Sequence, residues 1–248
     1  MDRDGHGGFI GWSRRLAARI AEAQGGLLYA NLGVRGLTTR EIREGQLAAA
    51  LALEPDLASL FSGTNDVLRP RFDLAAFAAD VRAMQQALRA AGATVITFTL
   101  PDLTPLLPWA RPLAGRIRAM NAAVREAGAE TGTRVVDFAA HAVSTDPRLW
   151  DPDRIHANAA GHARIADALA HALELPGASE HWSAPLPQAP REPGLVTMGR
   201  ELAWAGRYLV PWALVQLVPR ANARVRHAAP SVLQRVERPF SSRDSPHA

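Results

Sequence analysis

Short apolar runs alternate with longer segments of helical period along the first 175 residues. The short runs have the length and the flanking Gly, Pro or Asp residues of buried parallel strands, and they cover 27–32, 56–61, 93–98 and 134–138. Around them, apolar residues recur at helical spacing, which predicts helices over 11–23, 38–53, 74–91, 110–131 and 159–173. This alternation predicts a three-layer α/β/α sandwich with a parallel sheet and right-handed crossovers.

A change of composition ends this pattern near residue 175. Pro and Gly residues cluster over 176–194, which is typical of an extended linker. Beyond the linker, apolar and aromatic residues recur at roughly helical spacing and are followed by a stretch rich in Arg. We therefore expect a main domain over 1–175, a Pro-rich linker over 176–194, and a basic amphipathic C-terminal extension over 195–248 that is helical.

The charged residues narrow the chemistry that is open to the chain. Its 248 residues include 28 cationic residues, all of them Arg, and no Cys. A catalytic lysine, a P-loop lysine, a cysteine nucleophile and a thiolate zinc site are therefore excluded, and we expect no cofactor and no bound metal. The 19 Arg and 19 acidic residues of 1–177 cancel, so the net charge of +4 belongs to residues 178–248 and says nothing about the substrate.

Polar residues gather where three of the predicted strands end. The first strand is followed by Asn31 and Gly36, the second by residues 62–66, and the last by Asp153 and His156. Because ligands bind at the carboxyl ends of parallel strands, the three clusters are expected to meet at one edge of the sheet. Each cluster taken alone has a simpler explanation, such as a glycine at a strand exit, a capping Asn or a surface His beside an Asp. Their combination, in this order, favours a functional site.

These motifs resemble those of the SGNH or GDSL-type esterases and lipases, over about residues 1–173. Asn31 with Gly36 is similar to the second block of that family. Residues 63–66 match its Gly-x-Asn-Asp block, and residues 153–156 match its Asp-x-x-His block, followed by the usual Gly-His at 161–162. The closest resemblance is to actinobacterial-type members with a Pro-rich linker and a tail. The resemblance implies a flavodoxin-like fold, a small-molecule ester substrate and serine-type acyl transfer to water.

The resemblance also implies roles for four residues. His156 corresponds to the general base, and Asp153 to the carboxylate that orients its ring and stabilises the imidazolium. The backbone N–H of Gly36 and the side-chain amide of Asn65 correspond to the donors of the oxyanion hole. Two neighbouring residues are interpreted as structural: His162 in packing or capping, and Asp66 in holding the loop that presents the amide.

The chain departs from the family at its front, where the strand that ends in Gly-Asp-Ser and carries the nucleophile is not found. Residues 7–12 resemble the segment that normally follows that block, and Met1 stands directly before them. Ser13 is the only serine before the first predicted strand, and its place in the first helix predicts an exposed helix residue rather than a displaced nucleophile. Ser59 and Ser62 are interpreted as packing residues at a strand end.

Two explanations for the missing block remain open. Either the start codon has been placed too far downstream, and a strand with Gly-Asp-Ser is encoded before Met1, or the chain is a serine-less relative that binds a ligand without turnover. The first is favoured, because loss of a central strand would leave unpaired backbone and exposed apolar side chains on both neighbouring strands. In either case we expect the chain as written to be inactive as an esterase.

The C-terminal extension supports a separate hypothesis. Trp204, Tyr208 and Trp212 accompany apolar residues over 195–218, and Arg residues follow from 220 onward. A segment of this kind suits an anionic membrane surface, but we favour packing of its Trp face on the main domain. No recognition motif accompanies the charge, so no nucleic-acid partner is expected. Because the sequence shows no secretory signal and no apolar run of about 18 residues, we expect a cytoplasmic location.

Overall fold

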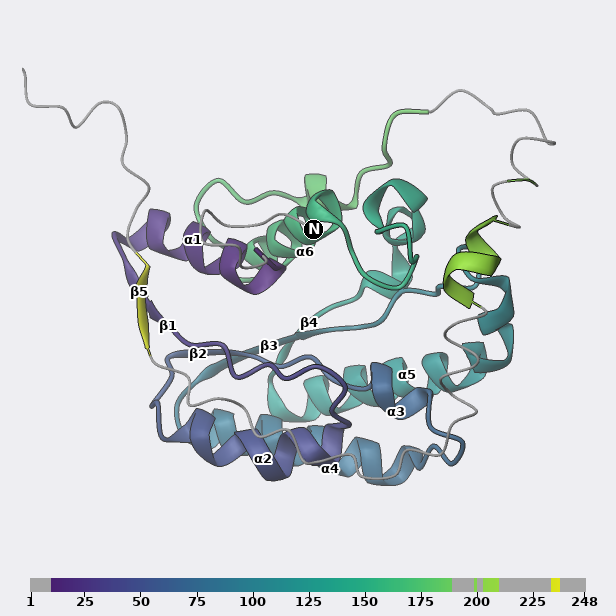
Figure 1. Ribbon diagram of the computed structural model, residues 1–248. Coiled ribbons are helices and arrows are strands. Elements are labelled where there is room, and N and C mark those ends of the chain that lie inside the picture. Colours follow the sequence, from purple (N-terminus) through teal and green to yellow (C-terminus); the bar gives the residue numbers. More distant parts are fainter. Residues whose placement is uncertain (1–9, 189–198, 200–202, 210–232, 237–248) are drawn as a thin grey trace, which may run out of the picture.

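The computed structural model describes residues 10–188, 199, 203–209 and 233–236. Figure 1 shows a sheet with helices on both sides. One face is covered by α1 (Trp12–Gln24) and α6 (Ala159–Ala172), and the other by α2 (Thr39–Leu51), α3 (Thr64–Val67), α4 (Leu74–Ala90) and α5 (Ala114–Thr131). The α/β/α sandwich expected from the hydrophobic pattern is therefore confirmed, with the long helices within a few residues of their predicted ranges.

The parallel sheet consists of β2 (Leu57–Ser59), β3 (Thr94–Phe98) and β4 (Arg134–Val136), with β3 in the middle. Ala58 pairs with Val95, and Thr97 pairs with Val135. Val95 and Ile96 have no exposed surface, as expected of a central strand that is covered by helices on both faces. Three of the four predicted strands are therefore confirmed in parallel order.

The first predicted strand does not join this sheet, and the expectation that 27–32 forms part of it is wrong. β1 (Leu27–Tyr29) pairs instead with β5 (Gln234–Val236) in an antiparallel ribbon, with Tyr29 opposite Gln234. Residues 234–236 fall in the extension that was expected to be helical. Their backbone groups pair with one edge of β1, and no other described strand pairs with β1, so β1 stands outside the parallel sheet.

Apolar side chains fill both sides of the parallel sheet. Phe98, at the end of β3, stacks on Phe61 with ring centroids 4.2 Å apart. It also meets the rings of Trp12 and Phe138 edge-on at 5.3 and 5.4 Å. Such aromatic contacts add to the burial of the rings, so the end of the central strand packs on α1 and on the segment that directly follows β4. The opposite face packs on Val67, Phe77, Val81, Ile117, Met120 and Val124.

Short 3-10 helices connect these elements. They are η1 (Pro108–Leu113), η2 (Phe138–Ala140), η3 (Ala142–Thr145), η4 (Pro147–Leu149) and η5 (Glu180–Ser183). Because η1 leads directly into α5, the helix predicted from residue 110 begins as 3-10 turns. In η5, Trp182 lies against Phe138 at 5.5 Å, and the Arg164 guanidinium donates to the carbonyls of Trp182 and Ala184, each at 2.7 Å. Residues shortly beyond 175 therefore pack on the main domain.

The C-terminal extension is described in two places. One is a helical turn over 203–209 that contains the π-helical η6 (Ala205–Leu209), and the other is β5. The predicted boundary near 175 and the linker over 176–194 stay predictions. Most of the residues that suggested the amphipathic extension lie outside the described residues, namely 195, 198, 202, 212, 214, 217, 220, 224, 226 and 238. None of the described helices is long and apolar enough to cross a membrane.

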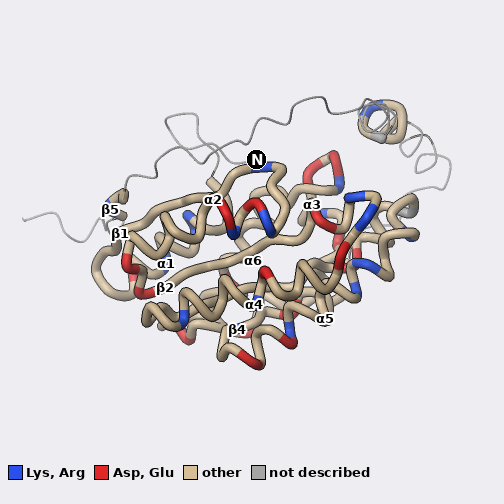
Figure 2. The backbone as a smooth tube through the Cα atoms, turned by 90° about the horizontal axis from the view of Figure 1, so that it is seen from below, with Lys and Arg blue, Asp and Glu red and all other residues tan. Residues whose placement is uncertain are grey.

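Acidic and basic residues are interspersed over the described backbone, as Figure 2 shows. Several form ion pairs that join neighbouring elements. Arg43 on α2 lies 2.9 Å from Asp80 on α4, and Arg125 on α5 lies 2.8 Å from Asp137 beside β4. This mixture agrees with the cancelling charges of residues 1–177.

Gly161 allows the first turn of α6 to lie against the backbone of Leu149. A Cβ at this position would collide with the Leu149 carbonyl oxygen, a backbone atom that cannot swing aside. We predict that Gly161→Ala lowers the free energy of unfolding by about 1–3 kcal/mol. Gly45→Ala is the matched control, because Gly45 lies within α2 and its Cβ would meet nothing within 4 Å. The free energy of unfolding of that variant should rise by about 0.5–1 kcal/mol. Urea unfolding followed by circular dichroism measures both, and an unchanged Gly161→Ala protein would contradict the close contact.

Candidate active site

The loop between η4 and α6 is closed at its base. Trp150 and Ala157 form an isolated antiparallel bridge across it. Asn158, the N-cap of α6, accepts the N–H of Gly161 at 3.0 Å, and its amide donates to the carbonyls of Arg148 and Trp150 at 2.8 and 3.1 Å. One side chain therefore caps the helix and also binds the residues where the loop begins, as an Asn at an N-cap is suited to do.

Within this loop, the Asp153 carboxylate accepts three hydrogen bonds. Its Oδ1 accepts the backbone N–H groups of Ile155 and His156 at 2.9 and 3.0 Å, and its Oδ2 lies 2.7 Å from His156 Nδ1. Burial opposes ionisation of Asp153, but these hydrogen bonds outweigh it and hold the pKa of the carboxyl below its ordinary value. Because an ionised carboxylate only accepts, the neutral form of the His156 ring carries its proton on Nδ1 and keeps the lone pair on Nε2.

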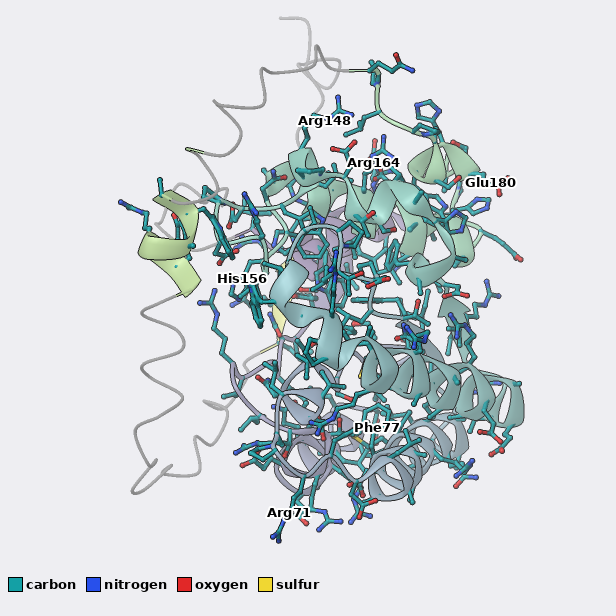
Figure 3. The ribbon with its side chains drawn as sticks, turned by 90° about the vertical axis from the view of Figure 1, so that its right-hand side faces the viewer. Arg71, Phe77, Arg148, His156, Arg164 and Glu180 are labelled. Atoms are coloured by element: carbon teal, nitrogen blue, oxygen red, sulfur yellow. The ribbon has the colours of Figure 1, made fainter. Side chains whose placement is uncertain are left out.

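His156 lies at the side of the molecule, away from Phe77 in the lower helical layer (Figure 3). Its side chain is 52% exposed. A cavity of about 390 Å³ adjoins it, which is within the size range of small-molecule sites. The cavity is lined by Ile10, Gly11, Ser13, Arg14, Tyr29, Asn31, Arg35, His156, Ala157, His162 and Gln234. This lining includes Arg and His residues but no carboxylate.

The two residues expected to form an oxyanion hole are brought close together. Asn65, at the start of α3, donates one amide N–H to the carbonyl of Leu37 at 3.0 Å, and Leu37 directly follows Gly36. An Asn amide has two N–H groups, so this bond orients the side chain and uses only one of them. Neither Asn65 nor Gly36 is among the residues that line the cavity, although Arg35, the neighbour of Gly36, is. Their roles in the oxyanion hole stay predictions.

Gly63 explains why the Gly-x-Asn-Asp segment needs its glycine. Gly63 has φ +108° as the N-cap of α3, and a Cβ there would meet the side chains of Met120 and Phe77. The Asp66 carboxylate accepts the N–H and the hydroxyl of Thr39, each at 3.0 Å. Burial raises the pKa of Asp66, and the bonds to Thr39 offset this only in part. Asp66 therefore fastens the segment to the start of α2, as expected of a structural residue.

Ser13 lies in α1 as expected, but it is half-buried and lines the cavity, so the expectation of an exposed helix residue is wrong. Its Oγ accepts the hydroxyl of Tyr29 at 2.9 Å. Tyr29 extends from β1 over the first turn of α1, which covers the serine. Burial raises the pKa of the Tyr29 hydroxyl above its ordinary value. Among the described residues, no hydrogen bond joins Ser13 to His156.

His162 caps α1, in agreement with the structural role expected of it. Its Nδ1 accepts the backbone N–H of Trp12 at 3.3 Å, and Trp12 is the first residue of α1. Burial lowers the pKa of His162, and the positive charge of Arg15 lowers it further. The residue is therefore held in its neutral form, in which Nδ1 is able to accept.

Sequence reasoning missed three residues that shape the site. The double donation by Asn158 was not foreseen, although an Asn before a predicted helix is a capping signal. Tyr29 was placed in a buried strand, where nothing marked it as a neighbour of Ser13. Gln234 lines the cavity from β5, and no local pattern could have brought it there.

The comparison with models of protein families shows to which family the chain belongs. A model of the GDSL-like lipase/acylhydrolase family matches residues 2–164. The chain belongs to this family. The GDSL-like assignment agrees with the resemblance of the Gly-x-Asn-Asp and Asp-x-x-His segments. No curated protein sequence matches the chain.

Solved structures of esterases share the GDSL-like fold. A variant of an acetyl-xylooligosaccharide esterase from Geobacillus stearothermophilus superposes with a TM-score of 0.57 and 20% identity, covering 73% of this chain and 88% of that one. An α/β hydrolase enzyme from the metagenome of Lake Arreo gives 0.55 and 22%, covering 69% and 88%. The esterase EstA from Pseudoalteromonas gives 0.54 and 17%, covering 66% and 86%. At these identities the likeness shows the fold alone.

The neutral state of His162 makes the stability of the protein dependent on pH. Above the ordinary His pKa of about 6.5 its contribution to stability is complete, and it is lost as the pH falls through the lowered pKa of the folded protein. His162→Asn keeps an acceptor for the Trp12 N–H but does not titrate. We predict that the free energy of unfolding of this variant falls less than that of the wild type between about pH 7.5 and 5.5. Equal slopes in urea unfolding would contradict the assignment.

Proposed function

We propose that the site around Asp153 and His156 hydrolyses small-molecule esters by acyl transfer through a serine. The contact of 2.7 Å between Asp153 and His156 Nδ1, at the margin of a cavity of about 390 Å³, carries the proposal. With Nδ1 protonated, His156 Nε2 takes the proton of the serine hydroxyl as the serine attacks the ester carbonyl. Asp153 then stabilises the imidazolium, and His156 returns the proton to the leaving alkoxide.

The developing oxyanion is stabilised in this proposal by two N–H groups. They are the backbone N–H of Gly36 and the amide N–H of Asn65 that does not face Leu37. Donors of this type act because they are fixed before the reaction, and each contributes about 2.7–4 kcal/mol to transition-state stabilisation. The bond from Asn65 to the Leu37 carbonyl and the bonds from Thr39 to Asp66 supply that fixation.

The nucleophile is proposed to come from a strand and loop outside the described residues. Two observations support this. β1 and β2 belong to separate sheets, so each has one edge that pairs with no described strand, and Leu28 on β1 is 63% exposed. A parallel strand between them would pair both edges and would end at the same side of the sheet as the loop after β1. Ser13 is a poorer candidate, because its Oγ is engaged by Tyr29 and lies within a helix.

The first test is hydrolysis of p-nitrophenyl acetate. We predict no turnover above buffer for the 248-residue chain, because no described serine is paired with His156. In-frame translation of the genomic DNA upstream of Met1 should reveal a strand that ends in Gly-Asp-Ser. A chain extended by that segment should hydrolyse the ester and lose about 10³-fold or more of its kcat on His156→Ala. Robust activity of the 248-residue chain that is lost on His156→Ala would instead point to an unrecognised nucleophile.

The second test addresses the oxyanion hole in the extended chain. Asn65→Ala should lower kcat about 10²–10³-fold, because it removes one donor that faces the transition state. The matched control is Gln24→Ala, which removes a side-chain amide that donates to the carbonyl of Gly26 at 2.9 Å and does not line the cavity. An equal loss of kcat in both variants, with unchanged circular dichroism, would contradict the role of Asn65.

The alternative is a relative that binds an ester-like ligand without turnover. The cavity beside His156 favours it as the second candidate, because binding needs the cavity but not the nucleophile. In-frame translation that finds no Gly-Asp-Ser block would leave this alternative standing. Membrane contact through the extension, the lack of a nucleic-acid partner and a cytoplasmic location stay predictions.

A further inference from the structure

A helical turn of the C-terminal extension lies against the loop that carries Asp153 and His156. Figure 3 shows this pale yellow-green turn on the same side of the molecule as His156. Trp204, in this turn, donates its indole N–H to the carbonyl of Pro152 at 2.7 Å. Its ring also packs on the apolar cluster of Leu103, Leu106, Leu107 and Ala110, together with Trp109, Trp150 and Ile155. The turn is therefore attached to the loop by a hydrogen bond and by apolar contact.

Arg154 makes a second contact with the same indole. Its guanidinium carbon lies 4.4 Å from the centroid of the Trp204 ring, a cation–π geometry. The same guanidinium donates to the carbonyl of Leu106 at 3.3 Å. Arg154 also has φ +59°, a left-handed conformation that a non-glycine residue adopts only when its surroundings hold it there. Trp204 and Leu106 are two of those surroundings.

The two contacts of Trp204 bracket Asp153 in the sequence. Pro152 and Arg154 are its immediate neighbours, so the indole contacts a backbone carbonyl on one side of Asp153 and a side chain on the other. The direction of that carboxylate decides whether Oδ2 reaches His156 Nδ1 and Oδ1 reaches the N–H groups of Ile155 and His156. Two backbone hydrogen bonds within the loop also act here: the Arg154 N–H donates to the Asp151 carbonyl and the Asp151 N–H to the His156 carbonyl, each at 2.8 Å. The contacts of Arg154 with Trp204 and Leu106 add to these bonds from outside the loop.

We propose that Trp204 is a positioning residue for the Asp153–His156 pair, and that the C-terminal extension thereby forms part of the active site. Its catalytic meaning rests on the function proposed above. The contact itself has a direct consequence for His156 that needs no substrate. The Nδ1–H tautomer is favoured as long as Asp153 Oδ2 accepts from it, and a displaced carboxylate returns the ring toward the tautomer ratio of free imidazole.

The test is the tautomer ratio of His156 in the full chain, measured from the imidazole ¹⁵N shifts of His-labelled protein at a pH where the ring is neutral. His156→Gln assigns the signals. Trp204→Phe keeps the packing and loses the indole N–H, and we expect it to lower the ratio of the Nδ1–H to the Nε2–H tautomer by roughly two- to tenfold, the contribution of one hydrogen bond. Trp204→Ala should lower it further. Asp153→Asn marks the ratio that results when the carboxylate is lost.

The matched control is Trp182→Phe. It makes the same substitution at a buried Trp whose indole N–H has no hydrogen-bond partner among the described residues, and Trp182 packs on Phe138 rather than on the loop. Its ratio should equal that of the wild type. Unchanged ratios in both Trp204 variants, with circular dichroism showing a folded chain, would overturn the proposal and leave Trp204 as a cover for the apolar cluster.

Two other outcomes separate this proposal from the proposed function. If Trp204→Ala fails to fold, Trp204→Phe decides alone. If the wild-type ratio already equals that of Asp153→Asn, the Asp153–His156 pair does not form in solution, and the proposed function fails together with the role of Trp204. If the ratio responds to Trp204 while the extended chain hydrolyses no ester, the positioning stands and only the function fails.

Discussion

The side chain of Asn158 is the constraint on which the architecture of the site depends. It caps α6 through the N–H of Gly161 and binds the carbonyls of Arg148 and Trp150, so the helix and the loop before it cannot separate. The orientation of α6 then brings His162, one turn further on, to the first residue of α1, whose N–H it accepts. One polar residue thus links the loop of Asp153 and His156 to both helices on that face of the sheet.

Features that depend on neighbouring residues were predictable from the sequence. The central strand β3 is mostly apolar because both of its faces are buried, and Thr38 is the N-cap of α2, where its hydroxyl and Glu41 form a capping box. The pairing of Asp153 with His156 is equally local. A carboxylate three residues before a histidine accepts its backbone N–H and reaches its ring, so the two partners of this contact lie within four residues of sequence.

Features that join distant residues were not predictable. β1 has the apolar composition of a buried strand, but composition does not say which strand pairs with it, and β5 comes from the far end of the chain. The cavity draws its lining from α1, β1, β5, the start of α6 and the loops after β1 and before α6. Ser13 is half-buried there because Tyr29 covers it from another element. Long-range contacts of this kind depend on the complete fold, whereas motifs and helix caps do not.

The C-terminal extension, too, has a place in the fold that depends on long-range contacts. Its charge and aromatic residues suit a membrane surface, but packing of its Trp face on the main domain is the favoured prediction, and its described residues contact that domain at two points beside the candidate site. Gln234 lines the cavity through the pairing of β5 with β1, and Trp204 holds Pro152 beside Asp153. Both contacts are made to segments that do not pair with the parallel sheet. One is β1 and the other is the irregular loop that contains Pro152. The extension therefore reaches both the cavity and the loop of Asp153 and His156, and in the proposal above Trp204 adds a contact to that loop which the sheet does not provide.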